Sequence, residues 1–467
     1  MKCIKLFFII ILTSCAQQKE VKITKIATPK LFIAQGTDHL DTKWWNSFNN
    51  KSLSGFVVQG LENNIFLKAN ELRLKSSEID TSITNSERYP SLSANTSASS
   101  DFDNFGNVDN VSLGLSSSWE IDLWGGINAN INRSHWNLQE DYALYRGRSN
   151  LVAGSITNAW LGVITEQEKE QVLAEQYKRT KDALKVITRR FEMGKNSVTN
   201  IWQQQRLLKS IEVQQSNNEA DLYLYRQTLA LWLAVPTDQI NIDQTLSLPK
   251  LPALPYIGIP AQVLKFRPDV QQAFAKIQAA NENLAIALSN QYPRVTLRAN
   301  YSTSSSSIND LLDDWAGNLI ASLAMPIFDS GVLKSVVEQR KLELKALILD
   351  YQQVWLEAIA SVNQVLINES QLLQIRKNLN QQLNLAKKTE KLTKIKYLSG
   401  KTNYLDLLRA QESILSLERQ KIDANKRVMT NRVLLYRELS HGDFSLNKQV
   451  SRNHIDGNNK SNQGTQF

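Results

Sequence analysis

Apolar and polar residues alternate along four segments of the chain with the two-residue period of a β-strand. The clearest segment runs from Val111 to Leu123, and residues 91–98, 295–302 and 319–327 repeat the pattern. One apolar and one polar face over about ten residues are typical of a strand in a transmembrane barrel, with lipid on one side and water on the other. The residues predicted to face lipid are Leu113, Trp119, Ile121, Leu297, Leu323 and Met325.

Two long stretches of the chain predict very long helices. There is no proline between Pro90 and Pro236 or after Pro326, and proline breaks helices. Residues 332–398 contain neither Gly nor Pro, and their apolar residues recur at three- and four-residue steps, which is the seam of a coiled coil. At about 1.5 Å per residue, this helix would be about 100 Å long.

Each long helical stretch is expected to reverse at a glycine. Gly194 and Gly400 stand where the left-handed backbone of a helix end is needed. Thr402 is the expected N-cap of the second returning helix, and either Ser197 or Thr199 is the expected cap of the first.

The chain consists of two halves that repeat the same order of elements. Residues 87–90 (Glu-Arg-Tyr-Pro) correspond to residues 290–293 (Asn-Gln-Tyr-Pro), and residues 190–195 match residues 396–401. A period of roughly 200 residues indicates a duplication rather than a short-period solenoid. The predicted organisation is residues 1–14 as a signal peptide, 15–86 as an N-terminal segment with a first helix, 87–247 as a first repeat of two strands and a helical hairpin, 248–262 as a Pro-rich linker, 263–442 as a second repeat of a helix, two strands and a hairpin, and 443–467 as a disordered tail.

The N-terminus predicts export and lipidation. Lys2 and Lys5 precede a short apolar core, which is the pattern of a secretory signal peptide. Residues 12–15 (Leu-Thr-Ser-Cys) then resemble the lipobox of bacterial lipoproteins, in which the Cys is acylated and becomes the first mature residue. The resemblance implies a lipid on Cys15. Ala16 in place of Asp implies an outer-membrane destination.

Composition narrows the function classes. The chain carries a formal charge of +9 without the aromatic-basic clusters typical of nucleic-acid binding. Cys3 leaves with the signal peptide and Cys15 would carry lipid, so no thiol is left for a disulfide, a metal or a nucleophile. No phosphate loop, GxSxG elbow or HExxH helix occurs. The sequence therefore predicts no catalytic residue, no metal site, no cofactor and no nucleic-acid partner.

The strand count predicts an oligomer. Four strands cannot close a barrel, since bacterial barrels have about eight strands or more. An open sheet in lipid would leave backbone N–H and C=O groups unpaired, at several kcal/mol each. Several chains must therefore donate strands to one barrel, although this argument does not fix their number.

Three motifs resemble those of the outer-membrane factor family, the TolC/OprM-like and NodT-type outer membrane efflux lipoproteins. Residues 44–48 (Trp-Trp-Asn-Ser-Phe) resemble the family's N-terminal WWxxF segment, and residues 266–273 (Phe-Arg-Pro-Asp-Val-Gln-Gln-Ala) are similar to its RRPDVxxAE element. Residues 397–411 are close to its helical-turn motif. Two positions of the first turn depart from the pattern, with Asn200 for the usual Asp and Gln204 for the usual Ala.

The resemblance implies the architecture and the partners. The expected fold is an α+β membrane protein: a homotrimer whose twelve-stranded transmembrane β-barrel, with four strands per chain, continues into a long α-helical coiled-coil periplasmic barrel. The expected function is passive efflux through the outer membrane. A periplasmic adaptor and an inner-membrane transporter of the resistance-nodulation-division or ABC type would load the tunnel.

The resemblance also assigns roles at the helix reversals. The turns are expected to dock the adaptor, and Asp406 matches an acidic position that lines the closed entrance of the family's tunnel. Three copies of Asp406 would form a ring that attracts cations. The residues expected to dock the adaptor are Arg190, Gly194, Lys195, Lys396, Gly400 and Lys401.

Two other functions fit parts of the pattern. The chain could be the exit duct of a type I protein-secretion system, because selectivity in such systems lies largely in the inner-membrane partner. It could also be a periplasmic coiled-coil lipoprotein scaffold without a pore, with its strands forming a soluble cap. Apolar strand faces distinguish a channel from such a scaffold, which has no reason to expose them.

Acylation of Cys15 is directly testable. We expect Cys15→Ala to remove the lipid and slow maturation, while a barrel still anchors the protein, because one lipid signal is a weak tether beside a membrane-spanning barrel. Mass spectrometry of the mature N-terminus checks this. An unmodified N-terminus at another residue would contradict it.

Overall fold

The computed structural model describes residues 29, 31–34, 36–37, 41–99, 110–243, 247–258, 260–306 and 308–440. The predicted signal peptide, Cys15 and the C-terminal tail lie outside the described residues. The main helices are η1 (Trp44–Phe48), α2 (Lys51–Asn63), α3 (Ile65–Ser86), α4 (Gly126–Glu192), α5 (Val198–Leu233), α6 (Pro260–Leu264), α7 (Pro268–Ser289), α8 (Val332–Leu398) and α9 (Tyr404–Leu439). The strands are β1 (Ser91–Ser99), β2 (Asn110–Ile121), β3 (Arg294–Ser305) and β4 (Ala316–Ala324).

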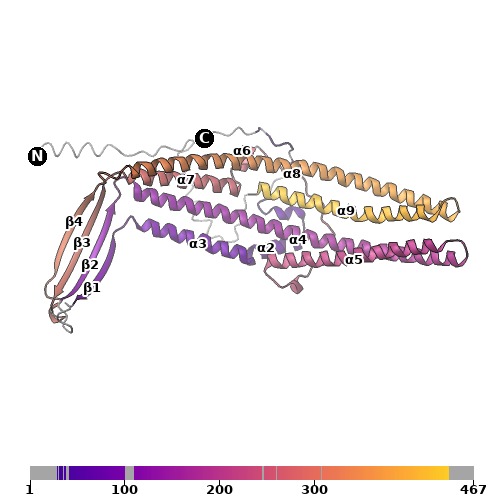
Figure 1. The fold of residues 1–467 in the computed structure, drawn as a ribbon, viewed down its shortest axis with the longest axis horizontal. Coiled ribbons are helices and arrows are strands. Elements are labelled where there is room, and N and C mark those ends of the chain that lie inside the picture. Colours follow the sequence, from indigo (N-terminus) through magenta and orange to yellow (C-terminus); the bar gives the residue numbers. More distant parts are fainter. Residues whose placement is uncertain are drawn as a thin grey trace. The chain divides into compact units, whose positions relative to one another are not determined.

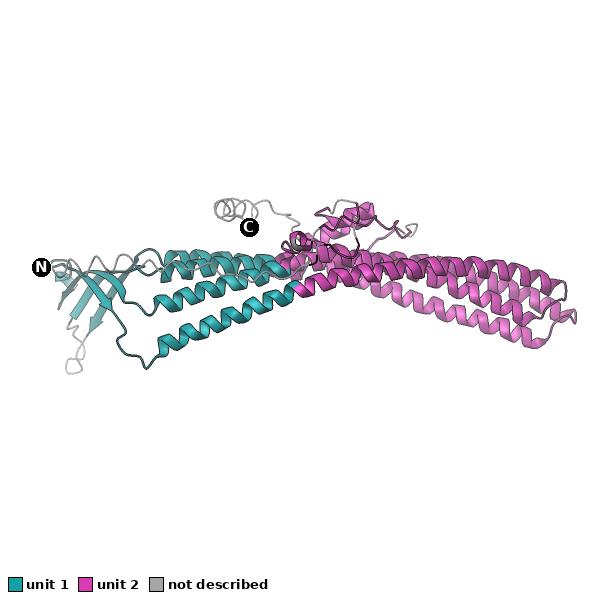
Figure 2. Cartoon of the chain, turned by 90° about the horizontal axis from the view of Figure 1, so that it is seen from above, with its two compact units in different colours: residues 1–27, 72–144, 269–355 teal, residues 28–71, 145–268, 356–467 magenta. Residues whose placement is uncertain are grey.

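The chain divides into two compact units, coloured separately in Figure 2. Unit 1 comprises residues 1–27, 72–144 and 269–355 and contains the four strands. Unit 2 comprises residues 28–71, 145–268 and 356–467 and contains both helix reversals. Helices α3, α4 and α8 contribute residues to both units.

The four strands of unit 1 form one antiparallel sheet in the order β1-β2-β3-β4. The helices of unit 1 adjoin one end of this sheet, and residues 308–315, between β3 and β4, lie at the other (Figure 1). Trp119 lies opposite Leu297, and Leu323 lies opposite Val295. Since residues opposite each other share a face, five of the predicted lipid-facing residues lie on one face: Leu113, Trp119, Ile121, Leu297 and Leu323.

The fourth strand is shorter than the sequence pattern predicts. β4 ends at Ala324, so Met325 lies just beyond it, with 56% of its surface exposed. The reason is Pro326, which has no N–H to donate to a neighbouring strand and restricts the backbone of the residue before it. The alternation at Met325 and Ile327 therefore continues after strand pairing has stopped.

In both halves an aspartate just before the long helix accepts hydrogen bonds from backbone N–H groups at the helix start, although the two turns differ in length. The Asp122 carboxylate accepts hydrogen bonds from the backbone N–H of Ile127 and Asn128 at 3.1 and 2.8 Å. In the second half, Asp329 accepts from Gly331 and Leu333 at 2.9 and 2.8 Å. A carboxylate at this position satisfies free N–H groups at the helix start and interacts favourably with the helix dipole.

The tryptophan pair Trp44–Trp45 packs deep in unit 2. Trp44 is fully buried, stacks on Tyr436 at a centroid distance of 5.7 Å and donates from Nε1 to Asn150 Oδ1 at 3.2 Å. Asn150 in turn donates to the backbone carbonyl of Arg437 at 2.8 Å. The N-terminal segment thereby covers the end of α9, and its indole N–H is satisfied as burial requires.

Each half also supplies a side chain that caps the C-terminal end of its own returning helix. Asn64 Nδ2 donates to the carbonyl of Trp232 near the end of α5 at 2.8 Å. Arg267 Nη1 donates to the carbonyl of Glu438 near the end of α9 at 3.1 Å and to the Glu438 carboxylate at 2.6 Å. Carbonyls in the last turn have no partner within the helix, so the Arg of the RPDV element has a structural role here.

The linker between the halves is held by a buried ion pair. Arg432 of α9 is 2% exposed and binds Glu369 of α8 with both ends of its guanidinium, at 2.5 and 2.9 Å. The same guanidinium donates to the carbonyls of Pro252 and Ala253, the second at 2.6 Å. A Pro-rich extended segment has few hydrogen bonds of its own, so this arginine fixes its course over α8 and α9.

The shared face gives a paired mutational prediction. Leu113→Arg is expected to impair assembly far more than Ser116→Arg, because Arg at the middle of a lipid face costs about 2–4 kcal/mol whereas the polar face accepts it. The measurement is the fraction of each variant recovered as oligomer in detergent.

Equal tolerance of both variants would contradict the assignment of the faces. Since a Leu113 packed in a soluble core would also be sensitive, labelling from the lipid phase provides the control. A lipid-soluble photoreactive probe should label the Leu113 face and leave the Ser116 face unlabelled.

Candidate functional site

The two helix reversals of unit 2 have the same backbone geometry. Gly194 and Gly400 have φ values of +69° and +71°, in the left-handed region. In each turn the residue after the glycine donates to the carbonyl five positions back, Lys195 to Arg190 and Lys401 to Lys396, both at 2.8 Å. This is the Schellman motif, which ends a helix at glycine without strain. The predicted turn positions are confirmed.

The charged residues at the turns differ in their surroundings. Lys195, Lys396 and Lys401 are exposed. The guanidinium of Arg190 instead lies over the ring of Tyr397, 5.0 Å from its centroid. Arg190 thus connects the two reversals by a cation–π contact, and of these four residues only the three lysines extend their charges into solvent.

Asp406 lies exposed in the first turn of α9. Its carboxylate accepts a hydrogen bond from Thr402 Oγ1 at 2.5 Å, and its backbone N–H donates to Asn403 Oδ1 at 2.9 Å. The N-cap is therefore Asn403 rather than the expected Thr402, because the Asn side chain reaches the N–H three residues on. In the first hairpin, Ser197 is the cap, accepting from the Thr199 N–H at 3.2 Å.

Hydrogen bonds between tyrosine and amide side chains join the two hairpin tips. Tyr397 OH donates to Asn196 Oδ1 at 2.8 Å, and the buried Tyr404 OH donates to Gln204 Oε1. Gln204 Nε2 completes the connection by donating to the Thr180 carbonyl at 2.9 Å. Burial raises the pKa of Tyr404, as do the neighbouring Tyr397 and Glu412, so its hydroxyl stays protonated and keeps donating.

An apolar core surrounds these bonds and contains residues of all four tip helices. Its buried members are Leu173, Ile187, Leu207, Ile211, Tyr397, Tyr404, Leu407, Leu408 and Leu415. Outside it, the exposed pair Arg206–Glu412 spans α5 and α9 at 2.9 Å, and such pairs contribute at most about 1 kcal/mol. Burial and the buried hydrogen bonds therefore hold the tips together.

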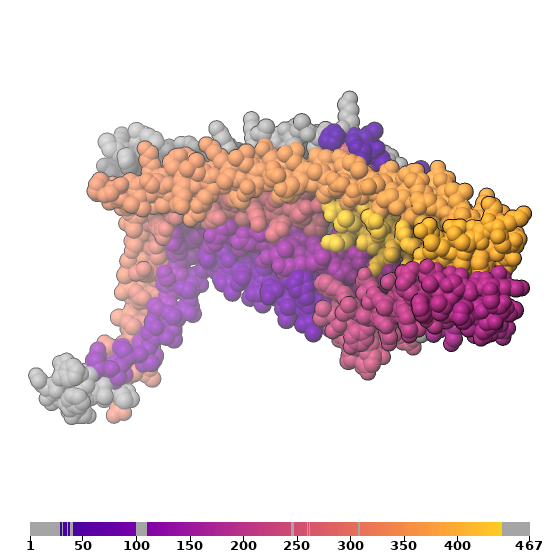
Figure 3. Space-filling model, turned by 45° about the vertical axis from the view of Figure 1, so that its right-hand side comes forward, coloured from indigo at the N-terminus to yellow at the C-terminus, as the bar shows by residue number. Residues whose placement is uncertain are grey.

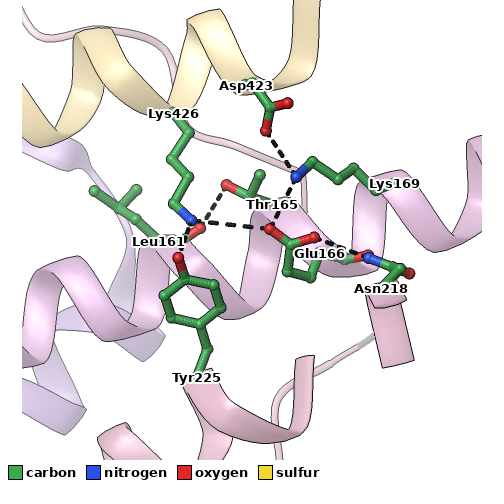
Figure 4. A network of polar contacts seen from close by, with 8 residues as sticks. All are labelled: Leu161, Thr165, Glu166, Lys169, Asn218, Tyr225, Asp423 and Lys426. Carbon is green, nitrogen blue, oxygen red and sulfur yellow. Dashed lines mark hydrogen bonds and ion pairs between the residues drawn. The ribbon is translucent and has the colours of Figure 1, made fainter. Parts of the chain in front are cut away.

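A second polar network joins α4, α5 and α9 farther along the hairpins (Figure 4). Its centre is Glu166, which is 2% exposed. The Glu166 carboxylate lies 3.1 Å from Lys169 Nζ and 3.8 Å from Lys426 Nζ, and accepts from Asn218 Nδ2 at 2.9 Å. A buried carboxylate needs such partners, because it is costly to remove from water alone.

The two lysines of this network reach further partners. Lys169 Nζ lies 2.7 Å from Asp423, and Lys426 Nζ donates to Tyr225 OH at 2.6 Å. Burial lowers the pKa of Lys169, but its hydrogen bond to Asp423 and the charge of Glu166 outweigh burial and raise the pKa overall. The network carries two carboxylates and two ammonium groups. Its contacts tie α9 to both helices of the first hairpin, and the α9 helix lies beside α8 (Figure 3).

Sequence reasoning missed the residues that join the hairpins. Asn196 and Gln204 carry no local signal of their role, since which face of one hairpin meets the other is not encoded in the period of either. One sign was available: Gln204 stands where the resembling family usually has Ala. A polar residue in place of a small apolar one at a buried seam implies a specific partner, which is Tyr404.

The described residues hold no group of three or more His, Cys, Asp or Glu side chains that could bind a metal ion. In the same part of the chain, no helix combines the length and apolarity needed to span a membrane.

Comparisons with known proteins give consistent matches. The family model described as outer membrane efflux protein matches residues 57–235 and 259–440. The probable outer membrane lipoprotein SilC of Salmonella typhimurium is 23% identical over 414 residues, which cover 86% of this chain and 88% of SilC. The pyoverdine export outer membrane protein OpmQ of Pseudomonas aeruginosa is 24% identical over 431 residues, covering 88% of this chain and 89% of OpmQ.

Among solved structures, the outer-membrane channel OprN superposes with a TM-score of 0.83. The match covers 91% of this chain and 99% of OprN, at 20% sequence identity. This likeness confirms the predicted α+β fold class, a small sheet combined with long helices.

The Glu166 network gives a stability prediction. Lys169→Met should lower the free energy of unfolding by about 1–3 kcal/mol, because it leaves a buried carboxylate short of a partner. Lys209→Met is the matched control, since Lys209 pairs with Glu212 at 2.7 Å on the same helical hairpin but is 75% exposed. We expect the control to change stability far less than Lys169→Met, because an exposed ion pair contributes little.

Denaturant unfolding in detergent, followed by helical circular dichroism, measures both variants. Equal losses would show that Glu166 does not depend on Lys169.

Proposed function

The chain belongs to the outer membrane efflux protein family, and we propose that it forms the outer-membrane exit channel of a tripartite efflux pump. The observation that carries the proposal is the four-stranded sheet, with one apolar face and with β1 and β4 at open edges. In lipid the apolar face is stable, but the open edges require further strands. A protein of this family resides in the outer membrane, where the apolar face of such a sheet can contact lipid.

A homotrimer satisfies the open edges. β1 of one copy pairs with β4 of the next, and three chains of four strands supply twelve strands to a closed barrel. The polar face then lines a water-filled lumen and the apolar face meets lipid. A lipid on Cys15 adds a second tether, in line with the description of the relative SilC as a lipoprotein.

Conduction through this channel is passive. The family consists of transport proteins, and the chain supplies a conduit while partners supply energy. A periplasmic adaptor docks at the hairpin tips, and an inner-membrane transporter of the resistance-nodulation-division or ABC type loads the substrate. The exposed lysines Lys195, Lys396 and Lys401 are suited to acidic groups on the adaptor, and Gly194 and Gly400 present their backbone at the same tips. Arg190 acts within the chain, through Tyr397.

Asp406 forms the cation-attracting ring at the entrance. Its carboxylate is exposed and held by Thr402, so its direction is fixed while its charge faces solvent. Three such carboxylates about a three-fold axis favour cations and constrict the pore. Asn200 stands at the matching place in the first half, so the ring contains one carboxylate per chain.

The channel proposal is tested in a planar lipid bilayer. Purified full-length protein should be an oligomer that requires detergent and should give discrete ion-conducting steps. A soluble, non-conducting particle would instead support a periplasmic scaffold. Export of protein rather than of small molecules would support a type I secretion duct.

Asp406→Ala should reduce cation selectivity and raise the baseline conductance without affecting trimer assembly. The same bilayer recordings measure this, with the reversal potential in a salt gradient as the selectivity readout. Unchanged conductance and selectivity would remove Asp406 from the gate. Loss of the trimer would show that its contact with Thr402 is structural.

A further inference from the structure

The polar face of the sheet is almost free of charge. Every residue of β1 on this face is Ser or Asn, and the face carries only three ionisable side chains along all four strands: Glu120, Arg294 and Arg298. Hydroxyl groups bond to each other across the strands, as in Ser93–Ser116 at 2.8 Å and Ser97–Ser112 at 2.7 Å. A neutral surface of this kind interacts weakly with a charged solute. Its few charged side chains therefore determine whether the surface attracts or repels an ion.

Arg298 lies deepest in the sheet of these three. Arg294 is the first residue of β3, at the helix end, where its guanidinium donates to Asn290 Oδ1 at 2.7 Å. Arg298 is four residues farther on, opposite Ser118 on one side and Ile320 on the other. From Arg298 to the loop end, the described residues of this face are all uncharged.

The charge of Arg298 is not neutralised by contact. The nearest carboxylate along the sheet is that of Glu120, which lies opposite Thr296 and therefore diagonal to Arg298. Both side chains are exposed, and neither forms an ion pair with another described residue. Diagonal neighbours are about 7–8 Å apart at the backbone. The two charges therefore lie at different positions along the strands and do not neutralise each other.

We propose that Arg298 is the residue by which the barrel discriminates solutes by charge, favouring multivalent anions. This inference rests on the proposed trimeric channel, in which three copies of Arg298 form a cationic ring in a hydroxyl-lined lumen. Serine and asparagine side chains around the ring can donate hydrogen bonds to an anion that the ring retains. The barrel thus has the opposite charge preference to the proposed Asp406 ring.

The test uses inositol hexakisphosphate as a probe in single-channel recordings at about 0.1 M salt, where charges act over about 10 Å. The helical part cannot cross the bilayer, so protein added to one compartment presents its barrel loops to the opposite one. Probe added on that opposite side should cause brief interruptions of the current. Arg298→Gln should shorten their mean duration, because it removes the positive charge that retains the anion, and Glu120→Gln should lengthen it, because it removes a repelling negative charge.

Arg298→Lys keeps the charge and is the matched control, with interruptions expected to match those of the unmodified protein. Interruptions unaffected by Arg298→Gln, or equally shortened by Arg298→Lys, would overturn the inference while the channel itself still conducts. The absence of conductance in the unmodified protein would instead reject the channel. Discrete conducting steps of the Arg298→Gln protein show that it is folded and assembled, and Glu120→Gln adds an independent effect of the opposite sign.

Discussion

The backbone groups on the open edges of β1 and β4 impose the central constraint on this chain. Each edge strand pairs on one side only, while one face of the same sheet is apolar and exposed. Apolar surroundings suit that face, but they make every unpaired N–H and C=O costly by several kcal/mol. Strands from further copies satisfy both demands together, so assembly and membrane insertion belong to one process. A chain that inserted alone would bury its apolar face in lipid but leave the backbone groups of β1 and β4 unpaired there.

The long helices have a related requirement. Along α8, Leu342, Leu349 and Leu356 are each at least half exposed and are spaced by seven residues. Farther along the helix, Leu385 and Leu392 are again seven residues apart and more than half exposed. A seven-residue spacing is that of a coiled-coil seam. No described residue of the chain buries these side chains, which is what a helical wall shared between neighbouring copies requires.

Local chemistry made much of the fold predictable. Residues 332–398 form one helix as expected, since nothing in that stretch breaks a helix, and Gly194 and Gly400 adopt the left-handed backbone that a reversal requires. The errors have equally local causes. Pro326 stops β4 before the alternation ends, and Asn403 caps α9 in place of Thr402.

Contacts between hairpins were beyond such reasoning. The cation–π contact of Arg190 with Tyr397 and the bond of Tyr404 to Gln204 depend on how one hairpin is rotated against the other. That rotation follows from the packing of the whole tip core, to which each helix contributes only a few residues. A sequence period specifies which side of a helix is buried, but not which polar residue on a neighbouring helix it will meet.

The caps of the returning helices show that each half contains the residue that caps its own hairpin. Asn64 closes α5 and Arg267 closes α9, each within its own half and each with different chemistry. A gene of half the length would therefore encode two strands, one hairpin and the cap of that hairpin. Six copies of such a protein would bring the same number of strands as three full-length chains. Fusion of two copies would have joined β2 to β3 permanently, and it lets the two tips diverge in sequence, as Asp406 and Asn200 do at matching places of the two hairpins.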